Sequence, residues 1–215
     1  YVQSASARLN SYIYKNLNSN INIMIYLISG APRVGKSIIA KQFAESIKGR
    51  FVSTDELEDP DNQSPSVIFY SDPKKNILSP SKRIESVKNE AKQIISEIEN
   101  IIIKAIDKPQ NTVIEGVHLF PTYVDKFVKK FGKDKIKVIF IGSTNIDLIL
   151  EGMIKNTSPN NWLKEFNQEV LRQIATFTKD FSYYLYHECK RYNFPYKERS
   201  NDFQKDIRDV MEELK

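Results

Sequence analysis

Short apolar runs and longer segments with helical periodicity alternate along the chain from residue 23 onward. The apolar runs predict five strands, at residues 23–29, 51–53, 112–116, 135–141 and 194–197. The intervening segments repeat apolar residues every three or four positions and predict helices at 36–48, 80–106, 121–131, 145–155, 162–192 and from about 202 to 214. This alternation indicates an α/β fold in which helices cover both faces of a five-stranded parallel sheet.

Residues with strong local preferences mark where several of these helices begin and end. Ser79 is expected to cap the longest regular helix, with Pro80 at its first position. Gly49 and Gly132 are expected to end the first and third helices, because glycine readily leaves the helical conformation. The final helix follows a Ser-Asn pair at 200–201, which is expected to cap it.

The strongest motif joins the first predicted strand to the first predicted helix. Residues 30–37 read Gly-Ala-Pro-Arg-Val-Gly-Lys-Ser, which matches the phosphate-binding P-loop in its strand–loop–helix setting. Gly30 permits a tight turn, and Gly35 lets backbone N–H groups approach phosphate oxygens. The helix start places unpaired N–H groups and a positive dipole end beside the same anion. The residues expected to bind ATP are Gly30, Ala31, Pro32, Arg33, Val34, Gly35, Lys36, Ser37 and Ile38.

Two residues of the loop and two acids on other strands carry the expected chemistry. Lys36 should reach the β- and γ-phosphates from outside the hydrophobic core, and the Ser37 hydroxyl should bind Mg²⁺. Asp55 follows the second predicted strand and Glu115 ends the third, at the sheet edge where such folds bind ligands. Two structural interpretations remain open. Asp55 could cap the next turn, and Glu115 could be a buried carboxylate satisfied by backbone N–H groups.

The combination resembles the small P-loop kinases, and most closely the group of 2-phosphoglycerate kinase and zeta-toxin-like kinases. The likeness rests on residues 30–37, on Ser-Thr-Asp at 53–55 and on Val-Ile-Glu-Gly-Val-His-Leu-Phe-Pro at 113–121. It implies a P-loop NTPase sandwich with strand order 2-3-1-4-5, an acceptor across the crevice from ATP, and a lid after the fourth strand. It also implies that Asp55 orients or deprotonates the acceptor hydroxyl or holds Mg²⁺ through water. Glu115 would serve the metal or the substrate.

The expected lid, at about 152–165, departs from many nucleoside monophosphate kinases because it contains no arginine. Guanidinium groups bind transferring phosphates in those families. Arg172, on the following helix, is the candidate for this charge and completes the expected catalytic set of Lys36, Asp55, Glu115 and Arg172. A solvated position on the helix is the other interpretation of Arg172. The expected metal ligands are Ser37, Asp55 and Glu115. His118, near the same edge, is interpreted as a packing residue.

Several functions fit a P-loop, because the motif alone names none of them. The guanine-reading Asn-Lys-x-Asp sequence of GTPases does not occur. The leading hypothesis is a Mg²⁺-dependent kinase that transfers the γ-phosphate of ATP to a small hydroxyl- or phosphate-bearing metabolite. The alternatives are an ATP-binding switch protein, and a nucleotide, nucleic-acid-end or toxin-type kinase.

Composition adds limits to these hypotheses. The net charge of +5 comes from lysines scattered over the chain, which suits small anionic substrates and does not require nucleic acid. The single cysteine, Cys189, excludes an internal disulfide and is compatible with a cytoplasmic location. No apolar run reaches the ~20 residues of a membrane span. We expect residues 1–22 to be a tail or a non-native extension, and 23–215 to form one domain with a substrate-recognition insertion at 57–80.

Overall fold

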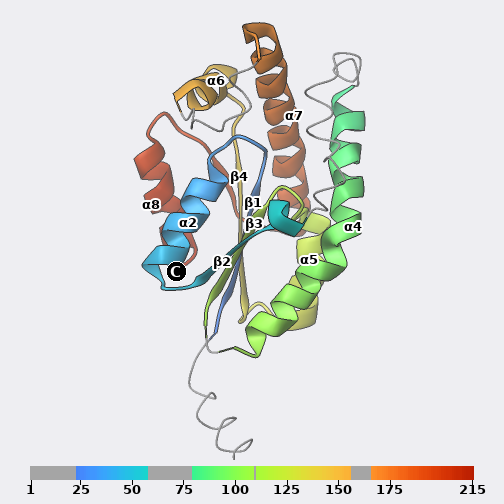
Figure 1. Cartoon of the computed structure of the whole chain (residues 1–215), viewed down its shortest axis with the longest axis vertical. Helices are drawn as coiled ribbons and strands as arrows, with labels where there is room; N and C mark the ends of the chain where they lie inside the picture. Colours follow the sequence, from blue (N-terminus) through green and yellow to red (C-terminus); the bar gives the residue numbers. More distant parts are fainter. Residues whose placement is uncertain (1–22, 58–78, 109, 156–165) are drawn as a thin grey trace, which may run out of the picture.

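The computed structural model describes residues 23–57, 79–108, 110–155 and 166–215. Within this part of the chain, helices lie on both faces of a central parallel sheet (Figure 1). The expected tail at 1–22, most of the insertion at 57–80 and the greater part of the lid at 152–165 lie outside the described residues.

The sheet contains the five expected strands. They are β1 (Ile25–Gly30), β2 (Arg50–Ser53), β3 (Thr112–Gly116), β4 (Ile136–Gly142) and β5 (Tyr196–Glu198). Their order is β2-β3-β1-β4-β5, and every pairing is parallel. The predicted fold class and strand order are therefore confirmed. All residues of β1 and β3 are buried, as expected for strands that are covered on both faces.

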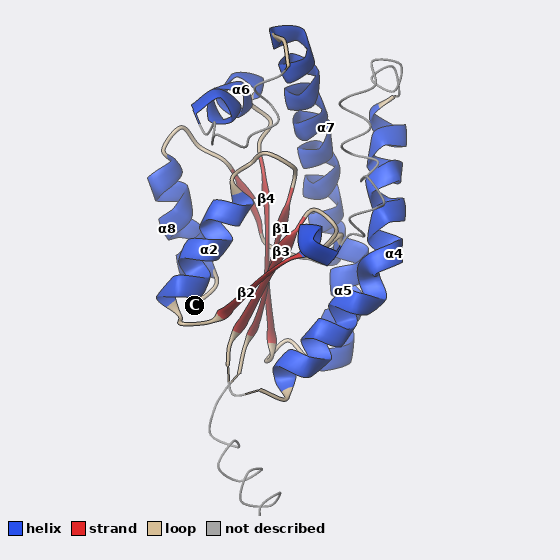
Figure 2. Ribbon diagram, in the orientation of Figure 1, coloured by secondary structure: helices blue, strands red, loops and turns tan. Residues whose placement is uncertain are grey.

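The helices divide into two layers around this sheet (Figure 2). One face carries α2 (Lys36–Ser46) and α8 (Phe203–Glu213), and the other carries α4 (Pro80–Ile106), α5 (Pro121–Phe131) and α7 (Gln168–Tyr192). The short helix α6 (Ile146–Lys155) lies beyond the carboxyl ends of the strands and packs against α7. A 3₁₀ helix, η1 (Thr54–Leu57), directly follows β2. No helix in the described ranges combines the length and the apolar character that a membrane span requires.

Two helices begin at residues other than the predicted ones, because different side chains cap them. Helix α7 begins at Gln168 and not at 162, and Asn167 caps it by accepting a hydrogen bond from the Val170 N–H at 3.0 Å. The cap of α8 is Asp202 and not the Ser-Asn pair at 200–201. The Ser200 hydroxyl is engaged elsewhere, because it donates a hydrogen bond to Asp206 Oδ1 at 2.9 Å.

Two predicted stop and start signals also act differently from expectation. At the end of α2 the left-handed residue is Lys48, with φ of 51°, and Gly49 follows it. Ser79 does occupy the cap position of α4, but its side chain bonds to the Ser81 hydroxyl and not to a helix N–H. Gly132 ends α5 with φ of 99°, as predicted. Local preference therefore located the helix ends, while neighbouring groups decided the contacts.

Candidate active site

The P-loop connects β1 to α2 and is shaped by close backbone contacts. At Gly30, a Cβ atom would lie 2.1 Å from the Ile141 carbonyl oxygen of the neighbouring strand β4. The Ala31 N–H donates to that same carbonyl at 3.0 Å, so the loop leaves the sheet against β4. Gly35 has φ of 86° and caps α2, where its carbonyl accepts from the N–H groups of Ile38 and Ile39. Both glycines of the motif are thus required by local geometry.

Lys36 forms a buried ion pair with Glu115. The Lys36 Nζ lies 3.5 Å from Glu115 Oε1, and the two side chains are 8% and 1% exposed. The pair forms because β1 and β3 are neighbours in the sheet, which places Glu115 beside Ile28, below the start of α2. Our expectation that Lys36 lies outside the interior is therefore wrong. Without a bound phosphate, the carboxylate is the partner that makes burial of this ammonium group tolerable.

The Glu115 carboxylate has unused capacity to accept ligands. Both of its oxygens are buried, and neither makes a hydrogen bond of good geometry within the described ranges; Lys36, at 3.5 Å, and Ser37 are the donors close to them. Burial raises the pKa of Glu115, nearby Lys36 lowers it and the Asp55 carboxylate raises it further. The Ser37 hydroxyl also lowers this pKa from close by. A buried carboxylate has several lone pairs to satisfy, and these two neighbours leave room on it for a ligand at the P-loop.

Asp55 lies in η1, at the carboxyl end of β2, with its side chain 67% exposed. Its own N–H donates to the Ser53 hydroxyl at 3.4 Å, while its carboxylate lies 4.0 Å from the His118 Nδ1. Because Asp55 acts on the pKa of Glu115, the two acids share one electrostatic environment. The structure therefore brings Lys36, Ser37, Asp55 and Glu115 together at the carboxyl edge of the sheet.

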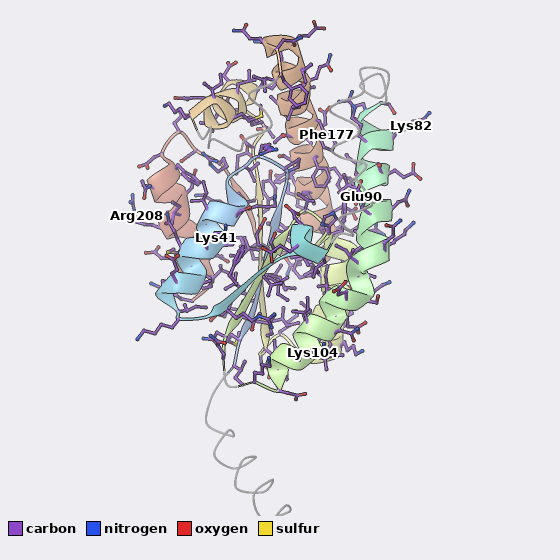
Figure 3. The ribbon with its side chains drawn as sticks, in the orientation of Figure 1. Lys41, Lys82, Glu90, Lys104, Phe177 and Arg208 are labelled. Carbon is purple, nitrogen blue, oxygen red and sulfur yellow. The ribbon has the colours of Figure 1, made fainter. Side chains whose placement is uncertain are left out.

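A buried polar cluster lies next to Asp55 and contains His118, Thr54 and Glu90. His118 is 1% exposed, and its Nδ1 lies 2.9 Å from the Thr54 hydroxyl. Its Nε2 lies 3.6 Å from Glu90 Oε2. Glu90 lies on α4 (Figure 3). The burial of His118 agrees with its interpretation as a packing or structural residue, but its named neighbours here are polar or ionisable. The sequence analysis missed Glu90, although a signal was present, since Glu90 lies three residues after Val87 on the apolar stripe of α4.

Two arginines differ from the expectation for this site. Arg172 is exposed in the second turn of α7, and no contact found within the described ranges joins its side chain to Lys36, Asp55 or Glu115. Its role over the γ-phosphate stays a prediction. Arg199, which the sequence analysis did not single out, donates from Nη1 to the Val34 carbonyl inside the P-loop at 2.6 Å. No sequence signal pointed to Arg199, because it lies 165 residues from its partner.

Comparisons with known proteins identify the fold. No protein-family model and no curated protein matches the chain by sequence. A gluconokinase from Sinorhizobium meliloti 1021 superposes with a TM-score of 0.52 and 16% identity, over 90% of this chain and 92% of the gluconokinase. A shikimate kinase from Bacteroides thetaiotaomicron gives 0.50 and 13%, over 88% and 97%. The chain therefore shares the fold of these two kinases. Neither of these similar structures belongs by name to the group of 2-phosphoglycerate kinase and zeta-toxin-like kinases. The resemblance to that narrower group stays a prediction.

Proposed function

We propose that this protein is a Mg²⁺-dependent kinase that transfers the γ-phosphate of ATP to a small hydroxyl- or phosphate-bearing metabolite. The observation that carries the proposal is the buried pair of Lys36 and Glu115 at the P-loop, with Ser37 close to the same carboxylate. A phosphate at the loop would give Lys36 a second anion, and a metal or substrate would use the carboxylate. The names of the similar structures, a gluconokinase and a shikimate kinase, support a small-metabolite acceptor.

The donor atoms at the site fit Mg²⁺. This ion prefers oxygen ligands and keeps several waters, with carboxylates often in its outer shell. The Ser37 hydroxyl would be the inner ligand that the loop supplies, and Glu115 and Asp55 would hold waters around the ion. When bound, Mg²⁺ supplies charge neutralisation on the phosphate oxygens. The described residues contain no group of three or more His, Cys, Asp or Glu side chains that could hold a metal alone.

The residues of the site divide the work of transfer between them. Lys36 offsets negative charge on the β- and γ-phosphates, and the N–H groups at the start of α2 bind phosphate oxygens. Asp55 is accessible from solvent, so it can meet the acceptor hydroxyl and take its proton as the oxygen attacks the γ-phosphorus. The bond from that phosphorus to the bridging oxygen breaks, and ADP leaves. Arg172 remains the candidate for a positive charge that closes over the γ-phosphate. The cytoplasm remains the expected location of the protein.

A metabolite panel tests the proposal. The protein is incubated with ATP, Mg²⁺ and pools of hydroxylated and phosphorylated metabolites, and mass spectrometry detects each phosphorylated product. We expect ADP formation that depends on one acceptor class and stops when EDTA removes the metal. The matched control is Asp55→Asn, which keeps the shape of the side chain and loses its charge. ATP binding without acceptor-dependent turnover across the panel would support the switch-protein alternative.

A further inference from the structure

Arg199, in the C-terminal region, donates a hydrogen bond to the backbone of the P-loop. Arg199 follows β5, and its own N–H donates to the Gly142 carbonyl at the end of β4, at 2.8 Å. From there its Nη1 donates to the Val34 carbonyl at 2.6 Å. The Arg199 side chain is only 12% exposed, so water competes little for this bond. A charge-assisted contact of this kind fixes the direction of the carbonyl.

A fully buried carboxylate fixes the guanidinium group in turn. Asp206 on α8 is 0% exposed and accepts from Arg199 Nε at 3.1 Å. The same carboxylate accepts from the Ser200 N–H at 2.9 Å and from the Ser200 hydroxyl at 2.9 Å. Lys197 Nζ lies 3.7 Å from Asp206 Oδ1, the oxygen that also accepts from the Ser200 hydroxyl. Both oxygens of Asp206 are thus engaged, and a buried charge with this many partners is held in one geometry.

The aromatic ring of Phe203 completes this support. The Arg199 guanidinium lies 4.3 Å from the centre of the Phe203 ring. A Cβ atom at Gly35 would lie 2.9 Å from the same ring and 3.3 Å from Arg199 Nη1. The start of α8 therefore packs directly against the residue that caps α2. Gly35 is required here by contact with α8 as well as by its φ.

The geometry points to Arg199 as a positioning residue for phosphate binding, an inference that rests on the proposed function. The peptide between Val34 and Gly35 is trans, as are all peptide bonds of the described residues, so its C=O and N–H point in opposite directions. Arg199 draws the Val34 carbonyl toward α8, and the Gly35 N–H therefore points away from α8. We infer that this orientation presents the Gly35 N–H to the bound phosphate. In this role Arg199 acts through the P-loop backbone.

Calorimetric titration with ATP tests the inference on the full chain. The variants are Arg199→Ala and Arg199→Lys. The matched control is Arg208→Ala, which removes an exposed arginine from α8, the helix that carries Asp206 and Phe203 (Figure 3). Because a hydrogen bond to a charged group is lost, Arg199→Ala should weaken ATP binding by about tenfold or more. Arg199→Lys keeps the charge and one directed donor, and should recover part of the affinity. Arg208→Ala should bind ATP within about twofold of wild type, as surface substitutions generally do.

A second measurement does not depend on the nucleotide. Selective ¹⁵N labelling of glycine gives seven backbone signals, one of which belongs to Gly35. In the nucleotide-free protein, Arg199→Lys should shift the Gly35 amide signal, and Arg208→Lys should leave it in place. This comparison carries the test if Arg199→Ala does not fold.

The outcomes separate the inference from the proposed function. A folded Arg199 variant with wild-type ATP affinity and an unmoved Gly35 signal would overturn the positioning role while leaving ATP binding intact. A wild-type protein that binds no ATP would overturn the proposed function, and the phosphate contact assigned to Gly35 with it.

Discussion

Replacing Lys36 by Met tests both the stability and the chemistry of the buried pair. The substitution keeps an unbranched side chain of similar length and leaves the Glu115 carboxylate, 1% exposed, without its cation. At 3.5 Å and an effective dielectric constant of about 20, the lost attraction is ~5 kcal/mol. The folded protein can avoid this cost by protonating Glu115. We therefore expect the substitution to raise the pKa of Glu115 beyond the increase that burial already causes.

Protonation sets an upper limit on the destabilisation. Each pH unit above the ordinary carboxyl pKa of 4.5 costs about 1.4 kcal/mol, so the limit at pH 7 is about 3 kcal/mol. When folding raises the pKa of a carboxyl group, the free energy of unfolding falls as the pH rises, because the unfolded chain releases that proton at a lower pH. The free energy of unfolding of Lys36→Met should thus approach that of wild type near pH 4.5. The difference should grow toward pH 7.

Urea denaturation at pH 5 and pH 7 measures these values for wild type, Lys36→Met, Glu115→Gln and the double variant. The double variant has no buried charge, so it should recover most of the stability lost by Lys36→Met. It should still bind ATP weakly, because the phosphate-binding ammonium group is absent. Equal stability of Lys36→Met and wild type at pH 7, or an equal loss at both pH values, would refute the reasoning.

Three further predictions concern the neighbours of this pair. Asp55→Asn should lower acceptor-dependent turnover by ~10²–10⁴-fold with nearly unchanged ATP affinity, and equal turnover would reduce Asp55 to a turn residue. Gly116→Ala should destabilise the fold by about 1–3 kcal/mol in urea, because its Cβ would lie 1.6 Å from the Thr54 hydroxyl. The control is Gly152→Ala, whose added Cβ would have no neighbour within 4 Å among the described residues. Burial raises the pKa of Cys189 to about 12, so a thiol reagent at pH 8 should label it slowly in the folded protein and rapidly in urea; rapid labelling of the native protein would contradict its burial.

Local sequence patterns determined most of the fold. The regular spacing of apolar residues correctly predicted where α4 begins and ends, because the amphipathic pattern starts at Pro80 and stops at Ile106. The glycines and the Lys-Ser pair of the P-loop defined the phosphate-binding element, because their chemistry acts within eight consecutive residues. The strand order came from the resemblance to small P-loop kinases and not from the pattern.

The contacts that build the site were decided only by the tertiary structure. Glu115 pairs with Lys36 because β3 lies beside β1, and this neighbour relation cannot be read from either segment alone. In the same way, α4 brings Glu90 to His118. The contact of Arg199 with Val34 joins residues 165 positions apart. Periodicity reports which face of an element is buried, but the partner of a buried charge depends on how distant elements pack, and that is a property of the folded chain.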